Sequence, residues 1–203
     1  MQTSLIVIDD FLAQSDALSL RQAALGLTYP DLQGAFPGRN SLERIQIPGL
    51  AQVISQRVGE PLRPVEPLQS HGKFRISKSG DVGEGRVHID GPVYWSGILY
   101  LSLPEHCHGG TEFFRHLPTG TDHAPRNDAE LQAMGLSSYD AVQSELIARD
   151  SNDASKWEMT MRVPMRFNRL VLLRPWLWHS AGEVFGDRMD NARLVYLMFF
   201  APA

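Results

Sequence analysis

Two side chains that can bind a metal lie one residue apart in the segment GRVHIDGP, at residues 85–92. His88 offers an imidazole nitrogen and Asp90 a carboxylate, and residues i and i+2 of a strand project from the same face. A single His-x-Asp pair is weak evidence by itself, because a local hydrogen-bonded pair in a strand-end loop would look the same. A metal site therefore needs a third ligand from elsewhere in the chain.

The third candidate is His179, in the segment NRLVLLRPWLWHS at residues 168–180. Two imidazoles and one carboxylate on one face of a metal form the typical site of non-heme Fe(II) oxygenases, which keep open positions for substrate and oxygen. A core histidine bonded to a backbone carbonyl is the alternative for His179. Only the fold can bring it beside His88 and Asp90.

The elements that would position these residues are mostly strands. The apolar run SLIVIDDFL predicts a short buried strand near the N-terminus. Apolar spacing predicts helices from Asp16 to Leu27, capped by Ser15, and from Gly49 to Val58, with a Pro- and Gly-rich loop between them. Further strands are expected at residues 72–77, 93–103, 111–114, 157–163, 167–173, 179–185 and 192–200.

A polar segment at residues 115–156 interrupts these strands. Helices are expected in it at residues 128–134 and 138–149, with Asp128 and either Ser137 or Ser138 as caps. This segment could be a lid that excludes water from a site, or an insertion without that role.

The fold class follows from the number of strands and the length. We interpret residues 1–203 as one domain, in which residues 1–70 supply the N-terminal strand and helices and residues 71–200 the β core. A mainly β domain with flanking helices and about eight strands favours a double-sheet jelly roll or cupin-like fold. A plain sandwich is the competing architecture.

Charge and composition exclude several classes of function. The net charge is -4 with no basic run, which argues against a nucleic-acid partner and favours a small-molecule or peptidyl substrate. The single cysteine, Cys107, cannot form an internal disulfide. Residues 1–12 fit neither a signal peptide nor a membrane span, so we expect a cytoplasmic protein without a membrane partner.

The ordered motifs HID, YLS, GGTEFF, NRLVLLRPWLWHS and NARLVYLMFF together resemble the Fe(II)- and 2-oxoglutarate-dependent dioxygenases, in the prolyl-4-hydroxylase-like branch. The resemblance implies a double-stranded β-helix, a jelly-roll variant, with Fe(II) bound by His88, Asp90 and His179. It also implies that Tyr100 and Arg193 hold the distal carboxylate of 2-oxoglutarate. The implied activity is hydroxylation of an unactivated C–H bond by molecular oxygen, with release of succinate and CO2.

The role of Arg193 at the distal carboxylate is also supported by its position in the sequence. Arg193 begins the apolar strand LVYLMFF, where an unpaired charge is expensive, and an arginine fork matches a carboxylate. The enlarged turn GEVFGDRM before it lets Arg188 compete for this role, although a solvated turn residue fits Arg188 better. Relatives also carry a tyrosine on the strand before His-x-Asp, and here Phe74, Ile76 and Ser77 occupy that region.

Other interpretations stay open. Zinc could bind at a second cluster, and a substrate cleft could be lined by Trp95, Phe114, Arg86 and Arg115, although the two aromatic residues fit the core as well. The chain could also be a non-catalytic jelly-roll protein that binds or senses a ligand, or a cupin-like metalloenzyme that does not use 2-oxoglutarate. The residues of the zinc alternative are His106, Cys107, His108, His116 and His123.

Overall fold

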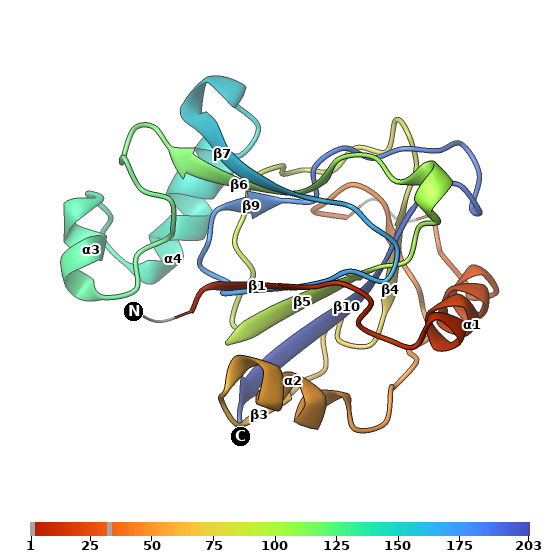
Figure 1. Cartoon of the computed structure of the whole chain (residues 1–203). Helices are drawn as coiled ribbons and strands as arrows, with labels where there is room; N and C mark the ends of the chain where they lie inside the picture. The colour runs from red at the N-terminus through yellow and green to blue at the C-terminus, as the bar shows by residue number, and fades with distance from the viewer. Residues whose placement is uncertain (1–2, 32–33) are drawn as a thin grey trace.

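Two antiparallel sheets face each other in the computed structural model, which describes residues 3–31 and 34–203 (Figure 1). This arrangement confirms the expected mainly β, double-sheet fold. The minor sheet has the order β7 (Trp157–Pro164), β6 (Gly110–His116) and β9 (His179–Ser180). The major sheet runs in the order β1 (Leu5–Ile8), β8 (Leu170–Leu173), β5 (Trp95–Tyr100), β10 (Arg193–Pro202), β4 (Phe74–Ser77) and β2 (Arg39–Asn40), and β3 (Leu62–Pro64) pairs with the end of β10.

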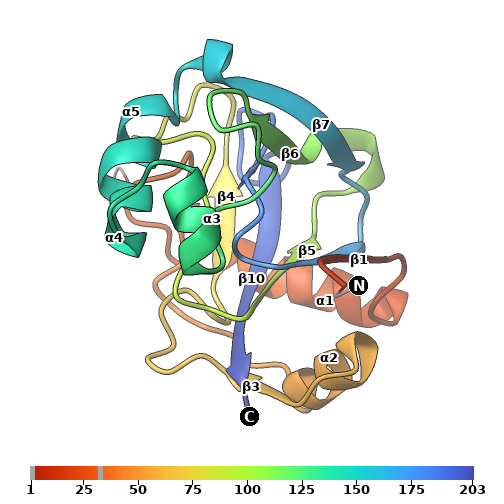
Figure 2. The same cartoon turned by 90° about the vertical axis from the view of Figure 1, so that its left-hand side faces the viewer.

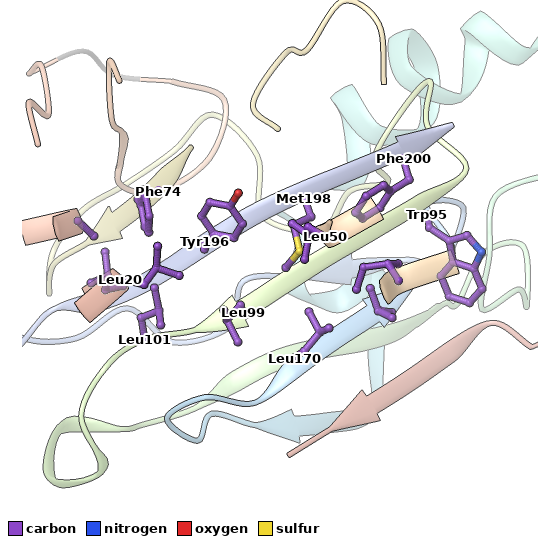
Figure 3. Close-up of a cluster of buried hydrophobic side chains, with 14 of the residues drawn as sticks. Leu20, Leu50, Phe74, Trp95, Leu99, Leu101, Leu170, Tyr196, Met198 and Phe200 are labelled. Atoms are coloured by element: carbon purple, nitrogen blue, oxygen red, sulfur yellow. The ribbon is translucent and has the colours of Figure 1, made fainter. Parts of the chain in front are cut away.

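Alternation along β10 gives the major sheet two different faces. Leu194, Tyr196, Met198 and Phe200 point into a core on the outer face, where the helices α1 (Gln14–Leu25) and α2 (Leu50–Val58) cover the sheet (Figures 1 and 3). The intervening residues point to the inner face, between the two sheets. That inner face carries the candidate site.

A second core lies between the sheets and holds them together. Phe113 and Val163 of the minor sheet pack with Val171, Leu173 and Val195 of the major sheet. The hydrophobic effect of this burial fixes how far apart the sheets lie.

The polar segment forms the helices on the left of Figure 2. Asn127 caps α3 (Asp128–Ala133), where Asp128 was expected, and Ser138 caps α4 (Tyr139–Ala141) as expected. The chain continues as a π-helix (Val142–Ile147) and α5 (Ala148–Asp150), and short 3₁₀ turns lie at Pro104–His106 and Ala154–Lys156. These helices bury Leu131, Val142, Leu146 and Ile147 against Trp157 and Trp178.

The structure differs from the predicted elements at several ends. Helix α1 begins at Gln14 after Ala13, so Ser15 is not its cap. The strands β2 and β3 were not predicted, because they are short and lie in Pro-rich stretches without a period-two pattern. Strand β9 ends at Ser180, well before residue 185. Among the described residues, no helix is long and apolar enough to cross a bilayer.

Candidate metal centre and cavity

The two predicted histidine ligands are brought together by one pair of backbone hydrogen bonds. The N–H of His88 donates to the carbonyl of His179 over 2.9 Å, and the N–H of His179 donates to the carbonyl of His88 over 3.0 Å. The Asp90 N–H donates to the carbonyl of Pro175 over 3.1 Å and extends the pairing. These hydrogen bonds hold the segment before β5 against the edge of the minor sheet. The centroids of the two imidazole rings are 4.4 Å apart.

The ligand atoms of the three residues converge. One atom each from His88, Asp90 and His179 lies within 4.8 Å of the others. The Nε2 atoms of His88 and His179 are 3.8 and 3.5 Å from the Asp90 carboxylate oxygens. Both distances are longer than those of ordinary hydrogen bonds.

A backbone carbonyl orients each ring. Nδ1 of His88 lies 3.1 Å from the carbonyl of Arg86, and Nδ1 of His179 lies 2.8 Å from the carbonyl of Leu177. A carbonyl only accepts, so each Nδ1 carries the proton when the ring is neutral, and each Nε2 presents a lone pair. Metal-bound histidines are held in this way. The three residues therefore form a donor set that fits a divalent metal.

Electrostatics in this group favour one charged pair beside a neutral ring. Burial and the neighbouring His179 lower the pKa of His88 to about 4. Burial opposes a charge on both other groups, but the attraction between Asp90 and His179 prevails, and it lowers the pKa of the carboxyl and raises the pKa of the imidazole. Without a metal, a proton on His179 therefore stabilises the charge of the Asp90 carboxylate. A metal cation bound by both residues would have the same effect.

The histidines of the zinc alternative do not form a comparable group. The triad at His88 is the one cluster of three or more candidate ligands found in residues 3–31 and 34–203. His116 instead lies buried against Asp150, with Nε2 3.0 Å from a carboxylate oxygen. Cys107 donates a hydrogen bond to the carbonyl of Ser102.

A cavity of about 460 Å³ lies beside the triad. All three ligand residues line it, together with the loop at residues 34–42 and the inner faces of β4, β5 and β10. The loop covers the centre, because the Phe36 ring lies 3.9 Å from the ring of His88. A Cβ at Gly38, which has a φ of 93°, would lie 2.1 Å from Oγ of Ser77, so the loop can approach β4 this closely only with glycine.

Arg193 lies on the wall of this cavity, and its side chain has no partner in the described part of the chain. Its side chain is buried, and among the described residues no hydrogen bond or ion pair satisfies its guanidinium. Burial lowers the pKa of the guanidinium, and Tyr100 partly offsets this effect. Arg188, its predicted competitor, is an exposed turn residue beside Asp187 and Asp190 and does not line the cavity.

The Tyr100 hydroxyl is already engaged. It accepts a hydrogen bond from the N–H of Thr111 over 2.9 Å and shares another with the Thr111 hydroxyl over 2.7 Å. The Tyr100 hydroxyl also donates to the carbonyl of Val163 over a long 3.5 Å, and a carboxylate near Arg193 would have to replace this acceptor.

Arg75 is a cavity residue that the sequence reasoning missed. On β4, Phe74 and Ile76 point into the outer core, so Arg75 must point inward, where it lines the cavity. Its guanidinium donates to the carbonyls of Phe36 and Pro37, and it also bonds to Asn40. The alternation of FRIS alone could have revealed this position.

The four residues suggested for a substrate cleft do not line the cavity. Trp95 points into the outer core and donates to Glu60, and Phe114 packs in the core of the helical segment. Arg86 and Arg115 lie beside Glu112 and Glu158, outside the cavity.

The helical segment also stays away from the cavity. No residue of the described segment 115–156 lines it, so the cover comes from the loop at residues 34–42. Ser151 instead connects the segment to the backbone just before His88. Its hydroxyl accepts a hydrogen bond from the N–H of Arg86 and donates one to the carbonyl of Val87.

Solved structures share this fold at low sequence identity. HygX from Streptomyces hygroscopicus, with nickel, 2-oxoglutarate and hygromycin B bound, is 17% identical with a TM-score of 0.55, over 100% of this chain and 84% of that chain. The non-heme alpha ketoglutarate dependent carbocyclase SnoK from nogalamycin biosynthesis is 13% identical with a TM-score of 0.56, over 100% and 81%. The corresponding epimerase SnoN is 15% identical with a TM-score of 0.57, over 100% and 77%.

These likenesses show that the chain has the jelly-roll fold of Fe(II)- and 2-oxoglutarate-dependent oxygenases. No curated protein matches the sequence. A family model matches residues 85–200, which include the triad, Tyr100 and Arg193. Because this match spans more than half of the chain, the chain belongs to the family of unknown function DUF6445.

Proposed function

We propose that this chain is a non-heme Fe(II)- and 2-oxoglutarate-dependent oxygenase that hydroxylates an unactivated C–H bond. One observation carries the proposal: a histidine, histidine and aspartate donor set shares a cavity with a buried arginine that has no partner among the described residues. The donor set fits Fe(II), and the arginine fits the free carboxylate of a keto acid. The two alternatives, a non-catalytic jelly-roll protein that binds or senses a ligand and a cupin-like enzyme without 2-oxoglutarate, do not need a carboxylate clamp beside the metal.

The protein residues have distinct roles in this function. His88, His179 and Asp90 would hold Fe(II) through the two Nε2 atoms and the carboxylate. Arg193 would bind the distal carboxylate of 2-oxoglutarate, and Tyr100 would donate its proton to the same group. When bound, the metal and the keto acid together supply the oxidising chemistry, with succinate and CO2 as products.

The cavity walls would protect this chemistry from water. Ile98, Val195 and Leu197 line the inner face of the major sheet, and Phe36 covers His88 from the loop. Apolar walls that keep water from a reactive centre suppress its side reactions.

The similar structures support the cofactors but leave the reaction open. HygX is described with 2-oxoglutarate bound, while SnoK and SnoN are described as a carbocyclase and an epimerase. The same fold thus supports several outcomes, and function must be argued from the site. Hydroxylation is our choice because Asp90 supplies a carboxylate, whereas the resemblance implies a small residue there in halogenating relatives. Membership of the prolyl-4-hydroxylase-like branch remains a prediction.

Anaerobic titration tests the proposal. Addition of Fe(II) to the protein with 2-oxoglutarate should give a weak visible charge-transfer band that saturates at one metal per chain. His179→Ala should lose the band, and His123→Ala, which changes a histidine outside the cavity, should keep it. A wild-type protein without the band, or a band that survives His179→Ala, would contradict the proposal.

A further inference from the structure

The cavity contains more positive charge than its implied cofactors can neutralise. Its lining includes four cationic side chains and a single acid, Asp90. Arg39 is neutralised by Asp31 at 2.8 Å. The other three cations, Lys73, Arg75 and Arg193, form no ion pair within the described part of the chain.

These three cations share one surface. Lys73 and Arg75 alternate along the chain at β4, Arg75 pairs with Val195 of β10, and the N–H of Leu197 donates to the carbonyl of Lys73. Arg193 lies two residues before Val195, on the same inner face. Residues i and i+2 of a strand are about 7 Å apart, so the cations form a row across the two strands.

Arg75 keeps its charge but has little spare hydrogen-bonding capacity. Burial and, to a smaller extent, Arg193 lower its pKa to about 10 against the opposing effect of Asp81, so the guanidinium stays protonated at neutral pH. The loop acceptors use most of its N–H groups. These acceptors are neutral, so the positive charge of Arg75 is solvated but not cancelled.

The ammonium group of Lys73 has only a weak interaction with a carboxylate among the described residues. In this part of the chain, Glu43 is the carboxylate that interacts with it, and the pKa of Glu43 is lowered mainly by the N–H of Thr28 and only weakly by Lys73. Glu43 is exposed and does not line the cavity. All three N–H groups of the Lys73 ammonium are therefore available to a ligand.

Charge can be counted without deciding which cation holds the cofactor tail. On the proposed function, Fe(II) would be neutralised by Asp90 and the keto-acid carboxylate, and the distal carboxylate would neutralise one of Lys73, Arg75 and Arg193. Two positive charges would remain in a cavity with no further acid. Uncompensated charge in a partly buried cavity is costly, and an anionic ligand would relieve this cost.

We propose that the substrate is a small organic acid whose carboxylate binds at Lys73 and Arg75 and whose apolar body lies against the loop and β10. The proposal rests on the proposed function for the chemistry of the site, but not for the position of the anion. Phe36, Leu42, Leu197 and Phe199 supply the apolar surface beside the two cations. The carboxylate would thereby fix which carbon faces the metal triad.

Pairs of matched probes test this proposal. We would measure binding of a panel of aryl- and alkyl-carboxylates and their primary amides by ligand-observed NMR. The protein would be loaded with Ni(II) and saturating 2-oxoglutarate, so that Arg193 is occupied. We expect carboxylates to bind at least about tenfold more tightly than their amides, and Lys73→Met to remove about tenfold of that affinity. Arg63→Gln, which removes an exposed charge outside the cavity, should have no effect.

The variants separate this proposal from the proposed function. Arg75→Gln should weaken binding of the same carboxylates. If Arg75→Gln does not fold, Lys73→Met keeps the test valid, because the Lys73 side chain makes no hydrogen bond within the described part of the chain and only lines the cavity. If the protein binds no metal or 2-oxoglutarate, the same panel is measured on Arg193→Met, where the acids should still bind through Lys73. A panel with no carboxylate bound, amides that bind equally well, or affinities unchanged by Lys73→Met would overturn the proposal.

Discussion

Replacement of Arg193 by methionine should stabilise the protein without ligands and destabilise it relative to wild type when 2-oxoglutarate is present. The guanidinium is buried and has no protein partner among the described residues, so the folded state bears a desolvation cost that only a ligand can offset. Methionine fills a similar volume, adapts to its surroundings and carries no charge.

The size of the effect follows from the burial of Arg193. Replacing a buried ion pair with apolar groups is often neutral or stabilising by about 1–4 kcal/mol, and a lone buried charge lacks even the attraction of a partner. Arg193 lines the cavity, where solvent can hydrate part of the guanidinium, so we take the lower half of that range, about 1–2 kcal/mol. For a chain of this length, this corresponds to a rise in Tm of about 2–8 °C.

The ligand should reverse this order. A ligand at 100 times its Kd stabilises the folded state by about 2.7 kcal/mol. Wild type with Ni(II) and saturating 2-oxoglutarate should gain this stability, and Arg193→Met should gain little of it. Wild type should then be the more stable protein by about 1 kcal/mol.

Urea unfolding followed by circular dichroism, with and without ligands, measures all four free energies. The matched control is Arg188→Met, which removes an exposed arginine from the preceding turn and should leave both the stability order and the ligand effect intact. The reasoning is refuted if Arg193→Met destabilises the ligand-free protein by more than about 1 kcal/mol, or if it retains the full ligand effect.

Three further predictions concern the surroundings of the site. Burial lowers the pKa of His116, despite its bond to a carboxylate, so its neutral form is favoured in the fold. Stability should therefore fall as pH drops from about 7.5 to 5.5, through the ordinary histidine range, and His116→Gln should show a smaller fall; an equal fall would contradict this. Tyr100→Phe should cost about 1–3 kcal/mol in urea unfolding, because the buried N–H of Thr111 loses its acceptor, and an unchanged stability would exclude this bond. Arg75→Gln should speed amide hydrogen exchange in residues 36–40, because Arg75 binds the carbonyls of Phe36 and Pro37 and the side chain of Asn40, and unchanged exchange would show that the loop is held by other contacts.

The candidate donor set could be predicted from sequence because its parts are local motifs with a fixed order. His88 and Asp90 share a face by their spacing, and His179 follows an apolar strand. The sequence could not show the backbone pairing of His88 with His179, because register between distant strands depends on the whole sheet.

The misassigned residues have a common physical cause. Strand β5 is buried on both faces, so Trp95 and Ile98 look equally apolar although they point in opposite directions. Where both faces of a sheet are covered, polar and apolar residues no longer alternate, and the sequence loses the signal for direction. Arg75 was missed because a charged residue in a strand is usually expected to face solvent, whereas here it faces the cavity between the sheets.

The loop at residues 34–42 shows a further limit of sequence reasoning. Its Pro- and Gly-rich composition predicts a loop but not its course over the metal centre. The course depends on Arg75, on the close approach at Gly38 and on the contact of Phe36 with His88. All three are tertiary contacts.

The most direct test of the proposed chemistry is the release of labelled CO2 from carboxyl-labelled 2-oxoglutarate by the Fe(II)-loaded protein in the presence of oxygen. We expect CO2 and succinate in equal amounts from wild type, and neither from His179→Ala. His123→Ala should behave like wild type, since this side chain lies outside the cavity. A wild-type protein that binds Fe(II) and 2-oxoglutarate but releases no CO2, or a His179→Ala variant that releases as much as wild type, would contradict the proposed enzyme.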